Sequence, residues 1–185
     1  MALLPEEMRI ILLIAVLLII SSCASNNGLK QQAINMEVQE QMEIRSIAFD
    51  DKGALPSKYT CDGANVNPPL AVKNIPSQAK SLALIVDDPD APRGDWVHWV
   101  VWNIPVTGTI REDSVPGVQG VNDFGKNSYG GPCPPSGTHR YFFRVYALNI
   151  ELNLQELAGK KNLEDAMRNH IVAKAEIVGT YKRKS

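Results

Sequence analysis

The chain has 185 residues, of which 44% are hydrophobic and 21% are charged. This composition is typical of globular proteins and is sufficient for one domain with a hydrophobic core. Its 19 Lys and Arg residues nearly balance its 20 Asp and Glu residues, which gives a formal net charge of -1. The balance argues against nucleic-acid binding, which needs a clustered basic excess, and against an acidic disordered chain.

An unbroken apolar run, Ile10–Ile20, lies near the N-terminus. A membrane-spanning helix needs about 20 apolar residues, so this shorter run fits the apolar part of a secretory signal. The sequence Ser21-Ser22-Cys23 follows the run and resembles a bacterial lipobox, in which the cysteine is lipidated. We therefore expect a lipoprotein signal peptide in residues 1–22 and lipidation of Cys23, with an uncleaved anchor or a plain signal peptide as the alternative.

The residues on either side of this signal refine the expectation. Glu6 and Glu7 are unusual at the start of such a signal, which favours translation from Met8. Residues 23–42 are polar and have no sustained apolar period, so they are expected to form a flexible tether to a domain in residues 43–185. The expected location is the bacterial cell envelope, facing the periplasm. Ala24 after the cysteine slightly favours the outer membrane where the cell has one.

Five segments from residue 43 onward predict β-strands, because they alternate in polarity or are rich in β-branched and aromatic residues. The apolar run 81–86 is continuous, which is typical of a strand buried on both faces. A helix is predicted over 163–174, with Asn162 as its N-cap, and a shorter helical turn over 154–158. These elements predict a mainly β fold, an antiparallel β-sandwich with one or two helices near the C-terminus. The predicted strands are 43–49, 81–86, 97–104, 140–148 and 175–181.

The stretch from Pro105 to Arg140 is rich in glycine and proline and contains more than half of the glycines in the chain. Long loops inside a compact domain are uncommon and usually functional. The loop ends in YGGPCPPSGTHRY (129–141), where Gly-Gly can offer backbone N–H groups and three prolines stiffen the chain. We expect a rigid backbone wall that cradles an anion.

Two histidines lie in motifs that can form a site. The motif DDPDAP (87–92) places Asp88 and Asp90 at the end of the buried strand, and VHWVVWNIP (97–105) and GTHRYFF (137–143) follow. A strand period of two places His98 on one face with Trp96, Val100 and Trp102. His98 and His139 can each donate a proton to a phosphate or carboxylate oxygen, and Asp88 can fix one ring. His170 is expected on the apolar stripe of the helix and is left out of the site.

These motifs, together with KYTCDGANVNPPL (58–70), resemble the phosphatidylethanolamine-binding protein family over about residues 43–182. The similarity is greatest to its bacterial Raf-kinase-inhibitor-like branch. The resemblance implies a β-sandwich with a small anion pocket at one end. Carried over residue by residue, it implies a ligand-binding set of Asp88, His98, His139 and Tyr141, with Asp90, Pro92, Gly130, Gly131 and Pro132 at the rim.

The resemblance implies a binding protein rather than an enzyme, with no cofactor and no bound metal. Its ligand is expected to be a small anion, a phospholipid head group, or a phosphorylated or acidic side chain of a protein partner. A regulatory role, such as inhibition of a kinase or a protease, is one form of this function. The alternative is a small hydrolase or metal-dependent enzyme that uses Asp88, His98 and His139.

Two cysteines remain after Cys23 is assigned to the lipid. Cys61 and Cys133 form an even pair, and the expected compartment is oxidising. A bridge between them would close a long loop and stabilise the fold. The same cysteines occur in motifs of the bacterial branch generally, so a disulfide and a pair of buried thiols remain equal alternatives here.

Overall fold

The structure is a computed structural model that describes residues 41–183. The predicted signal peptide, Cys23 and nearly all of the predicted tether lie outside these residues. Within residues 41–183, no helix combines the length and the apolarity that a membrane span needs. The elements in chain order are β1 (Glu43–Arg45), a 3-10 helix η1 (Ser57–Tyr59), β2 (Leu70–Lys73), β3 (Ser81–Asp88), β4 (Trp96–Ile104), β5 (Thr109–Ile110), β6 (Val118–Gln119), β7 (His139–Leu148), α2 (Lys160–Met167) and β8 (Ile171–Tyr181).

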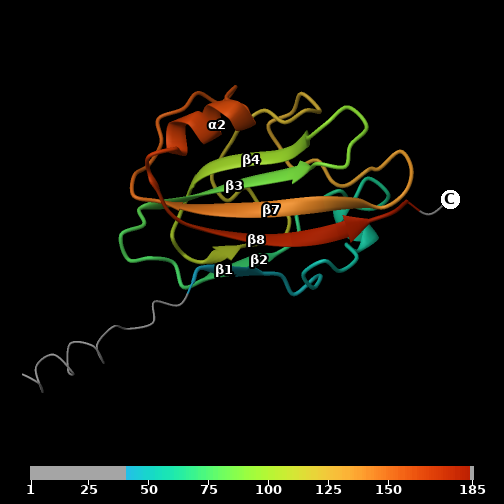
Figure 1. Cartoon of the computed structure of the whole chain (residues 1–185), viewed down its shortest axis with the longest axis horizontal. Coiled ribbons are helices and arrows are strands. Elements are labelled where there is room, and N and C mark those ends of the chain that lie inside the picture. The colour runs from blue at the N-terminus through green and yellow to red at the C-terminus, as the bar shows by residue number, and fades with distance from the viewer. Residues whose placement is uncertain (1–40, 184–185) are drawn as a thin grey trace, which may run out of the picture. The chain divides into compact units, whose positions relative to one another are not determined.

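The strands form two antiparallel sheets (Figure 1). The smaller sheet has the order β1-β2-β5, and the larger has the order β6-β4-β3-β7-β8. All eight residues of β3 are buried, which explains its continuous apolar run at the centre of the larger sheet. The predicted fold class, a mainly β antiparallel sandwich with a helix near the C-terminus, is therefore confirmed.

Two hydrophobic cores lie on the two faces of the larger sheet. The first packs one face against the smaller sheet and contains Ile44, Val72, Leu84 and Phe143. The second lies on the opposite face, where Leu163 and other residues of α2 cover β3 and β4 (Figure 1). The central strands β3 and β4 are thus buried on both sides, and their polar groups that must reach a ligand are restricted to the strand ends.

The predicted helix 163–174 is wrong in its bounds. The helix covers Lys160–Met167, and residues 171–181 form β8, which pairs along its length with β7. Asn162 is not the N-cap: Gly159 holds that position, and the Asn162 side chain accepts a hydrogen bond from its N–H. Residues 156–157 form a turn, so the predicted helical turn over 154–158 is absent. Pairing with the long strand β7 outweighs the local helical pattern.

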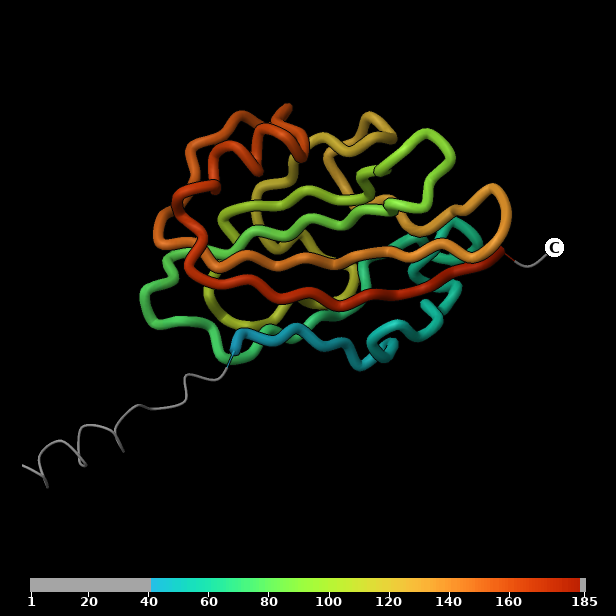
Figure 2. The backbone as a smooth tube through the Cα atoms, in the orientation of Figure 1, coloured from blue at the N-terminus to red at the C-terminus, as the bar shows by residue number. Residues whose placement is uncertain are grey.

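The prediction of the other strands is mixed. The central strands β3, β4 and β7 were placed to within two residues, whereas β1 is shorter than the predicted segment 43–49 and β8 is longer than 175–181. The strands β2, β5 and β6 were missed because they have only two to four residues. Figure 2 shows that the loops around residues 60, 92 and 134 gather at one end of the sandwich. The predicted site residues lie at this end.

Candidate functional site

A β-bulge in β4 determines where His98 lies. Val86 on β3 pairs with Trp99 on β4, but the next residue, Asp87, pairs with Val97. His98 is therefore an additional residue without a partner on β3. A bulge of this kind bends the strand and redirects a side chain, and bulges are frequent beside functional sites.

The bulge overturns the prediction that His98 shares a strand face with Val100 and Trp102. Those two residues belong to the core beneath α2. The His98 ring instead packs edge-on against the ring of Tyr141, at a centroid distance of 5.2 Å, and Tyr141 belongs to the core between the sheets. One inserted residue moves a side chain to the other face, because the strand period is two.

Asp88 and His139 form a buried pair on the adjacent strands β3 and β7. His139 Nδ1 lies 2.7 Å from Asp88 Oδ2, and the two side chains are only 8% and 5% exposed. A carboxylate accepts hydrogen bonds, so the Nδ1–H of His139 is the donor. The Nε2 atom of His139 then carries a proton only when the ring is cationic.

His98 is held in the same way by a backbone carbonyl. Its Nδ1 atom lies 2.5 Å from the carbonyl oxygen of Gly130, and the residue is buried. Burial lowers the pKa of His98, although the Gly130 carbonyl and the Asp88 carboxylate act in the opposite direction. Because Nδ1–H is used internally, His98 also donates from Nε2 only as a cation. An anion that accepts from both rings must therefore bind together with protons.

A cavity of about 330 Å³ brings part of the predicted set together. Asp88, His98, His139 and Pro92 line it. The other predicted residues, Asp90, Tyr141, Gly130, Gly131 and Pro132, are not among its lining residues. Seven lining residues were not in the predicted ligand set: Ala91, Arg93, Trp96, Phe124, Cys133, Pro134 and Pro135.

Asp90 anchors a neighbouring arginine. Its carboxylate accepts hydrogen bonds from Arg140 Nε at 2.8 Å, Arg140 Nη2 at 2.7 Å and the Arg140 backbone N–H at 2.9 Å. This hydrogen-bonded pair lowers the pKa of Asp90 to about 2. The backbone N–H of Asp90 donates to Asp88 Oδ1 at 2.9 Å. Asp90 therefore supports Asp88 directly and is linked to His139 through the adjacent residue Arg140.

The expectation that the Gly-Gly turn offers free N–H groups to an anion is wrong. The Gly130 N–H donates to the His98 carbonyl at 3.0 Å, and the Gly131 N–H donates to Asn65 Oδ1 at 2.7 Å. A Cβ atom on Gly131 would lie 2.5 Å from that Asn65 oxygen, so the close approach requires glycine. The carbonyl of Pro132 accepts from the Cys61 N–H at 3.1 Å. The turn therefore supports the cavity from outside its lining: these groups are occupied within the protein, and the Gly130 carbonyl holds His98.

Tyr141 lies behind His98. Its hydroxyl is buried and has no hydrogen-bond partner within residues 41–183. Burial raises the pKa of Tyr141, and the negative charge of Asp88 raises it further. A buried hydroxyl without a partner is unusual in a folded protein and often marks a functional position.

The structure joins Cys61 and Cys133 in a disulfide, with a Cα–Cα distance of 5.4 Å. Both residues are exposed, and Cys133 also lines the cavity. The bridge joins the proline-rich loop, which we define as residues 129–138, to the segment after η1. Of the two alternatives that the sequence left open, the structure contains the bridge.

The lining residues that the sequence did not reveal are mostly apolar. The Phe124 ring packs on His98 at a centroid distance of 5.3 Å and on Trp96 at 5.4 Å. The Asn122 side chain holds this segment, because its Oδ1 accepts from the N–H groups of Phe124 and Lys126. A phenylalanine 26 residues from His98 along the chain carries no local signal for a site. Arg93, which follows the DPDAP motif directly, could have been noticed as a cation at the rim.

The residues that the structure describes contain no group of three or more His, Cys, Asp or Glu side chains arranged to hold a metal ion. The proposed metal triad of Asp88, His98 and His139 therefore does not form. Asp88 is instead hydrogen-bonded to His139 Nδ1.

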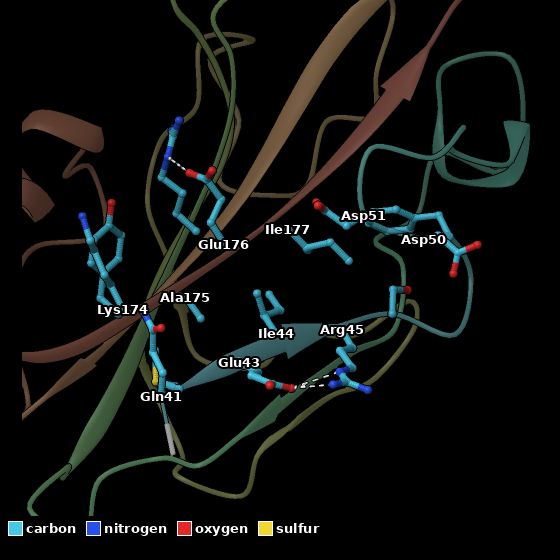
Figure 3. Close-up of a pocket in the computed structure, with 15 residues that line it drawn as sticks. Gln41, Glu43, Ile44, Arg45, Asp50, Asp51, Lys174, Ala175, Glu176 and Ile177 are labelled. Atoms are coloured by element: carbon cyan, nitrogen blue, oxygen red, sulfur yellow. Dashed lines mark hydrogen bonds and ion pairs between the residues drawn. The ribbon is translucent and has the colours of Figure 1, made fainter. Parts of the chain in front are cut away.

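A larger groove, of about 790 Å³, lies between the edge strands β1 and β8. Figure 3 shows charged side chains of both signs around it, among them Arg45, Asp51, Lys174 and Glu176, with the apolar Ile44 at its floor. None of the predicted site residues lines this groove. Volume alone therefore does not identify the site, and the buried histidines favour the smaller cavity.

The comparisons with known proteins identify the family and the fold. The family model for phosphatidylethanolamine-binding protein matches residues 45–182. The UPF0098 protein of Methanothermobacter thermautotrophicus is 50% identical over 150 residues, which cover 77% of this chain and 99% of the relative.

Two solved structures are also similar. The putative phosphatidylethanolamine-binding protein homologue of Chlamydia trachomatis has a TM-score of 0.76 at 42% identity, and the match covers 78% of this chain and 99% of that chain. For E. coli YbcL the TM-score is 0.72 at 31% identity, with the same two coverages. The chain belongs to the phosphatidylethanolamine-binding protein family.

Proposed function

We propose that this protein binds small anions of the phosphate type in the cavity between His98 and His139. The observation that carries the proposal is the pair of buried histidines, each with Nδ1 occupied internally and both lining one cavity. When the rings are protonated, their Nε2–H groups are donors for which the described residues provide no acceptor. Charge-assisted hydrogen bonds to an anion satisfy them.

The charges around the cavity support this ligand. Asp88 is paired with His139, so its negative charge is compensated within the site. Arg93 lies at the rim, is exposed and makes no ion pair within the described part of the chain. The formal net charge of the whole chain is only -1, so the attraction of an anion must come from these local groups.

The walls favour an anion that carries an organic group. Trp96, Phe124, Pro134 and Pro135 present apolar surface around the two histidines. The matching family model is named for phosphatidylethanolamine binding. A phospholipid head group and a phosphorylated or acidic side chain of a protein partner both combine an anion with such a group, and a regulatory role through a partner is consistent with this site.

Binding is proposed over catalysis because the lining of the cavity lacks a hydroxyl, amine or free thiol nucleophile. Its lining residues include no serine, threonine or lysine, and the sulfur of Cys133 is held in the disulfide. Acid–base chemistry by His98 and His139 remains the alternative, and hydrolysis of a phosphate ester by the purified protein would support it.

Calorimetric titration of the full-length protein in detergent tests the proposal. We expect inorganic phosphate and phosphoethanolamine to bind, and a higher affinity for phosphoethanolamine would identify a head-group site. His98→Ala and His139→Ala should each weaken binding by about ten- to a hundredfold, the value of a charge-assisted hydrogen bond. His170→Ala is the matched control, because His170 contacts Asn149 outside the cavity. Unchanged affinity in the folded His98/His139 double variant would overturn the proposal.

We also infer that the protein is anchored to the bacterial cell envelope by lipid on Cys23 and faces the periplasm. The support is the apolar run Ile10–Ile20 followed by Ser-Ser-Cys. The match to the family model begins only at residue 45, so the segment that carries this signal precedes the family domain. The exposed disulfide suits an oxidising compartment.

A further inference from the structure

We propose that Lys160 and Asp87 position the wall of the anion cavity and so set its affinity without touching the ligand. This inference rests on the proposed function. The wall in question is the cavity loop, which we define as residues 89–95, between the end of β3 and the start of β4. It supplies Ala91, Pro92 and Arg93 to the cavity.

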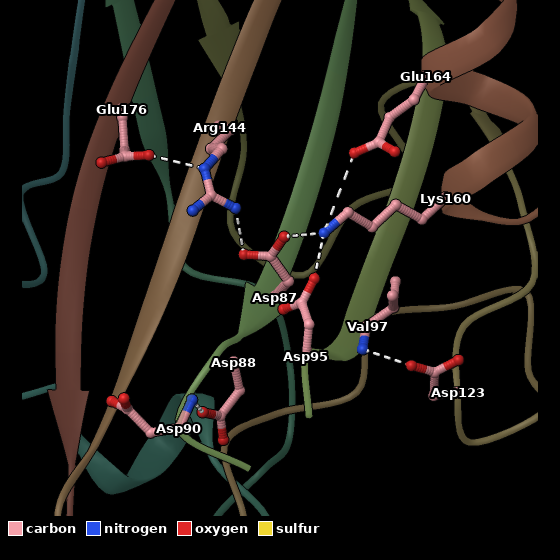
Figure 4. Close-up of polar contacts among 10 residues, drawn as sticks. All are labelled: Asp87, Asp88, Asp90, Asp95, Val97, Asp123, Arg144, Lys160, Glu164 and Glu176. Carbon is pink, nitrogen blue, oxygen red and sulfur yellow. Dashed lines mark hydrogen bonds and ion pairs between the residues drawn. The ribbon is translucent and has the colours of Figure 1, made fainter. Parts of the chain in front are cut away.

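One ammonium group connects the two ends of the cavity loop. Lys160 Nζ donates to Asp87 Oδ2 at 2.6 Å, and it also donates to Asp95 Oδ2. Asp87 lies just before the loop and Asp95 is its last residue. Lys160 is itself the first residue of α2, so the same group attaches both loop ends to the helix (Figure 4).

Asp87 needs these contacts because it is buried. Its side chain is fully buried, whereas that of Lys160 is 21% exposed. A buried carboxylate must be paired with cations and hydrogen-bonded, and here Arg144 on β7 is the second cation. Glu176 on β8 in turn accepts from Arg144 Nε at 2.7 Å. The cluster therefore spans β3, β7, β8 and α2, and it lies on the face of the sheet opposite the cavity.

The alternation of side chains along β3 links the position of Asp87 to the position of Asp88 in the site. Asp87 and Asp88 are adjacent in β3, so their side chains point to opposite faces. Asp87 is held by Lys160, and Asp88 holds His139 at 2.7 Å. On the cavity side, the loop is also fixed by the Asp90–Arg140 pair, and Arg140 is the residue after His139. Loss of the Lys160 contacts would free the start and the end of the loop together and shift Asp88 relative to His139.

Two variants separate positioning from folding. Asp95→Asn weakens only the contact at the loop end and leaves the buried Asp87–Lys160 pair intact, so it should fold. Lys160→Met keeps the aliphatic stem and removes the ammonium group, and Lys160→Arg restores a cation. Lys161→Met is the matched control, because Lys161 is the next residue, is exposed, and pairs within residues 41–183 only with Asp165 on its own helix.

The measurement is calorimetric titration of inorganic phosphate into each full-length variant, together with hydrogen exchange of residues 89–95. We expect Lys160→Met to bind phosphate about tenfold more weakly, in the range that outer-shell groups produce at other sites. Asp95→Asn should also bind phosphate more weakly than wild type. The backbone amide hydrogens of the cavity loop should exchange faster in this variant. Lys160→Arg should recover most of the affinity, and Lys161→Met should match wild type.

The outcomes distinguish this inference from the proposed function. If wild type binds phosphate and the His98/His139 double variant does not, but folded Lys160→Met and Asp95→Asn bind like wild type, the positioning role is wrong and the anion site stands. If Lys160→Met fails to fold, the phosphate affinity of Asp95→Asn decides whether the positioning role is correct. If wild type itself does not bind phosphate, the proposed function falls and this inference falls with it.

Discussion

His98 shows how one residue links the fold to the proposed chemistry. The bulge turns its ring toward the cavity, and the Gly130 carbonyl fixes which ring nitrogen carries the proton of the neutral form. The same burial that shapes the site lowers the pKa of His98 and therefore favours the neutral ring in the free protein. An anion reverses that preference, because it favours the cationic ring.

This residue makes stability depend on pH with a definite sign. An unfolded histidine has a pKa of about 6.5, and the folded pKa of His98 is lower, so the unfolded state binds more protons in that window. The stability that depends on a neutral His98 is fully present above about pH 6.5. It is lost as the pH falls through the folded pKa of His98. We expect urea unfolding to show a larger loss of stability between pH 7.5 and pH 5 in wild type than in His98→Gln.

Sulfate provides the control, because its charge does not change over this range. It should reduce the pH-dependent loss in wild type by binding the protonated ring. Equal losses of stability in wild type and His98→Gln, without sulfate, would show that the folded pKa of His98 is not lowered.

Tyr141 should show a trade between stability and binding. Tyr141→Phe removes a buried hydroxyl without a partner, so the free energy of unfolding should rise by about 1 kcal/mol. If the hydroxyl donates to the bound anion, phosphate affinity should fall about fivefold, the value of one neutral hydrogen bond. Denaturation and titration of the same variant check both effects. A less stable variant, or one with unchanged affinity, would contradict this account of Tyr141.

For single residues, the sequence predicted which side chains belong to the site better than it predicted where they lie. Asp88, His98 and His139 stand in recognisable motifs, and the structure gathers all three at one cavity. Strict alternation nevertheless put His98 on the wrong face, because a bulge leaves no mark in the pattern of polarity. The N–H groups of Gly130 and Gly131 were misjudged because their acceptors, the His98 carbonyl and Asn65, are far away in the sequence.

At the scale of elements, the site depends on loops that are fixed at several points. The cavity loop is held by the Asp90–Arg140 pair and by Lys160. The proline-rich loop is held by the disulfide and by the hydrogen bond from Cys61 to Pro132. Preformed loops of this kind lower the entropy lost on binding.

Removal of the disulfide should therefore affect both stability and binding. Cys61 and Cys133 are 72 residues apart, and on the chain-entropy model a loop of this size is worth roughly 4 kcal/mol. We expect the Cys61→Ser/Cys133→Ser double variant to lose about 2–4 kcal/mol of unfolding free energy and to bind phosphate more weakly. Denaturation and titration, with dithiothreitol-reduced wild type alongside, check this. Unchanged affinity would mean that the loop holds its shape without the bridge.

Element boundaries near the C-terminus show where local patterns fail. Leu163 and Met167 lie on one helix face and are buried, as the periodicity predicts. The same periodicity runs on to Ile171, but residues from Ile171 onward pair with β7. Strand pairing is non-local, so a pattern read from neighbouring residues cannot locate the end of this helix.

At the scale of the whole molecule, the predicted anchor and the described domain have separate proposed roles. The described domain contains the cavity, and we propose that the N-terminal signal determines the location. In the proposed location, the periplasm, a disulfide is stable and phospholipid head groups are near.

Lipidation is tested by substitution of Cys23. Cys23→Ser should release the protein from the membrane fraction or leave the precursor uncleaved, because the lipid attachment atom is lost. Cell fractionation and intact-mass measurement check this, with wild type as the reference. A soluble wild-type product that carries an unmodified Cys23 would contradict the proposed anchor.

The central claim, an anion held between His98 and His139, is tested most directly by nuclear magnetic resonance of the imidazole groups during a sulfate titration. The chain has three histidines, so each signal can be assigned with three single variants. Sulfate should shift the signals of His98 and His139 together, with one saturation curve and uptake of protons. The signal of His170, which contacts Asn149 away from the cavity, should not move. No shift at His98 and His139, or an equal shift at all three, would contradict the claim.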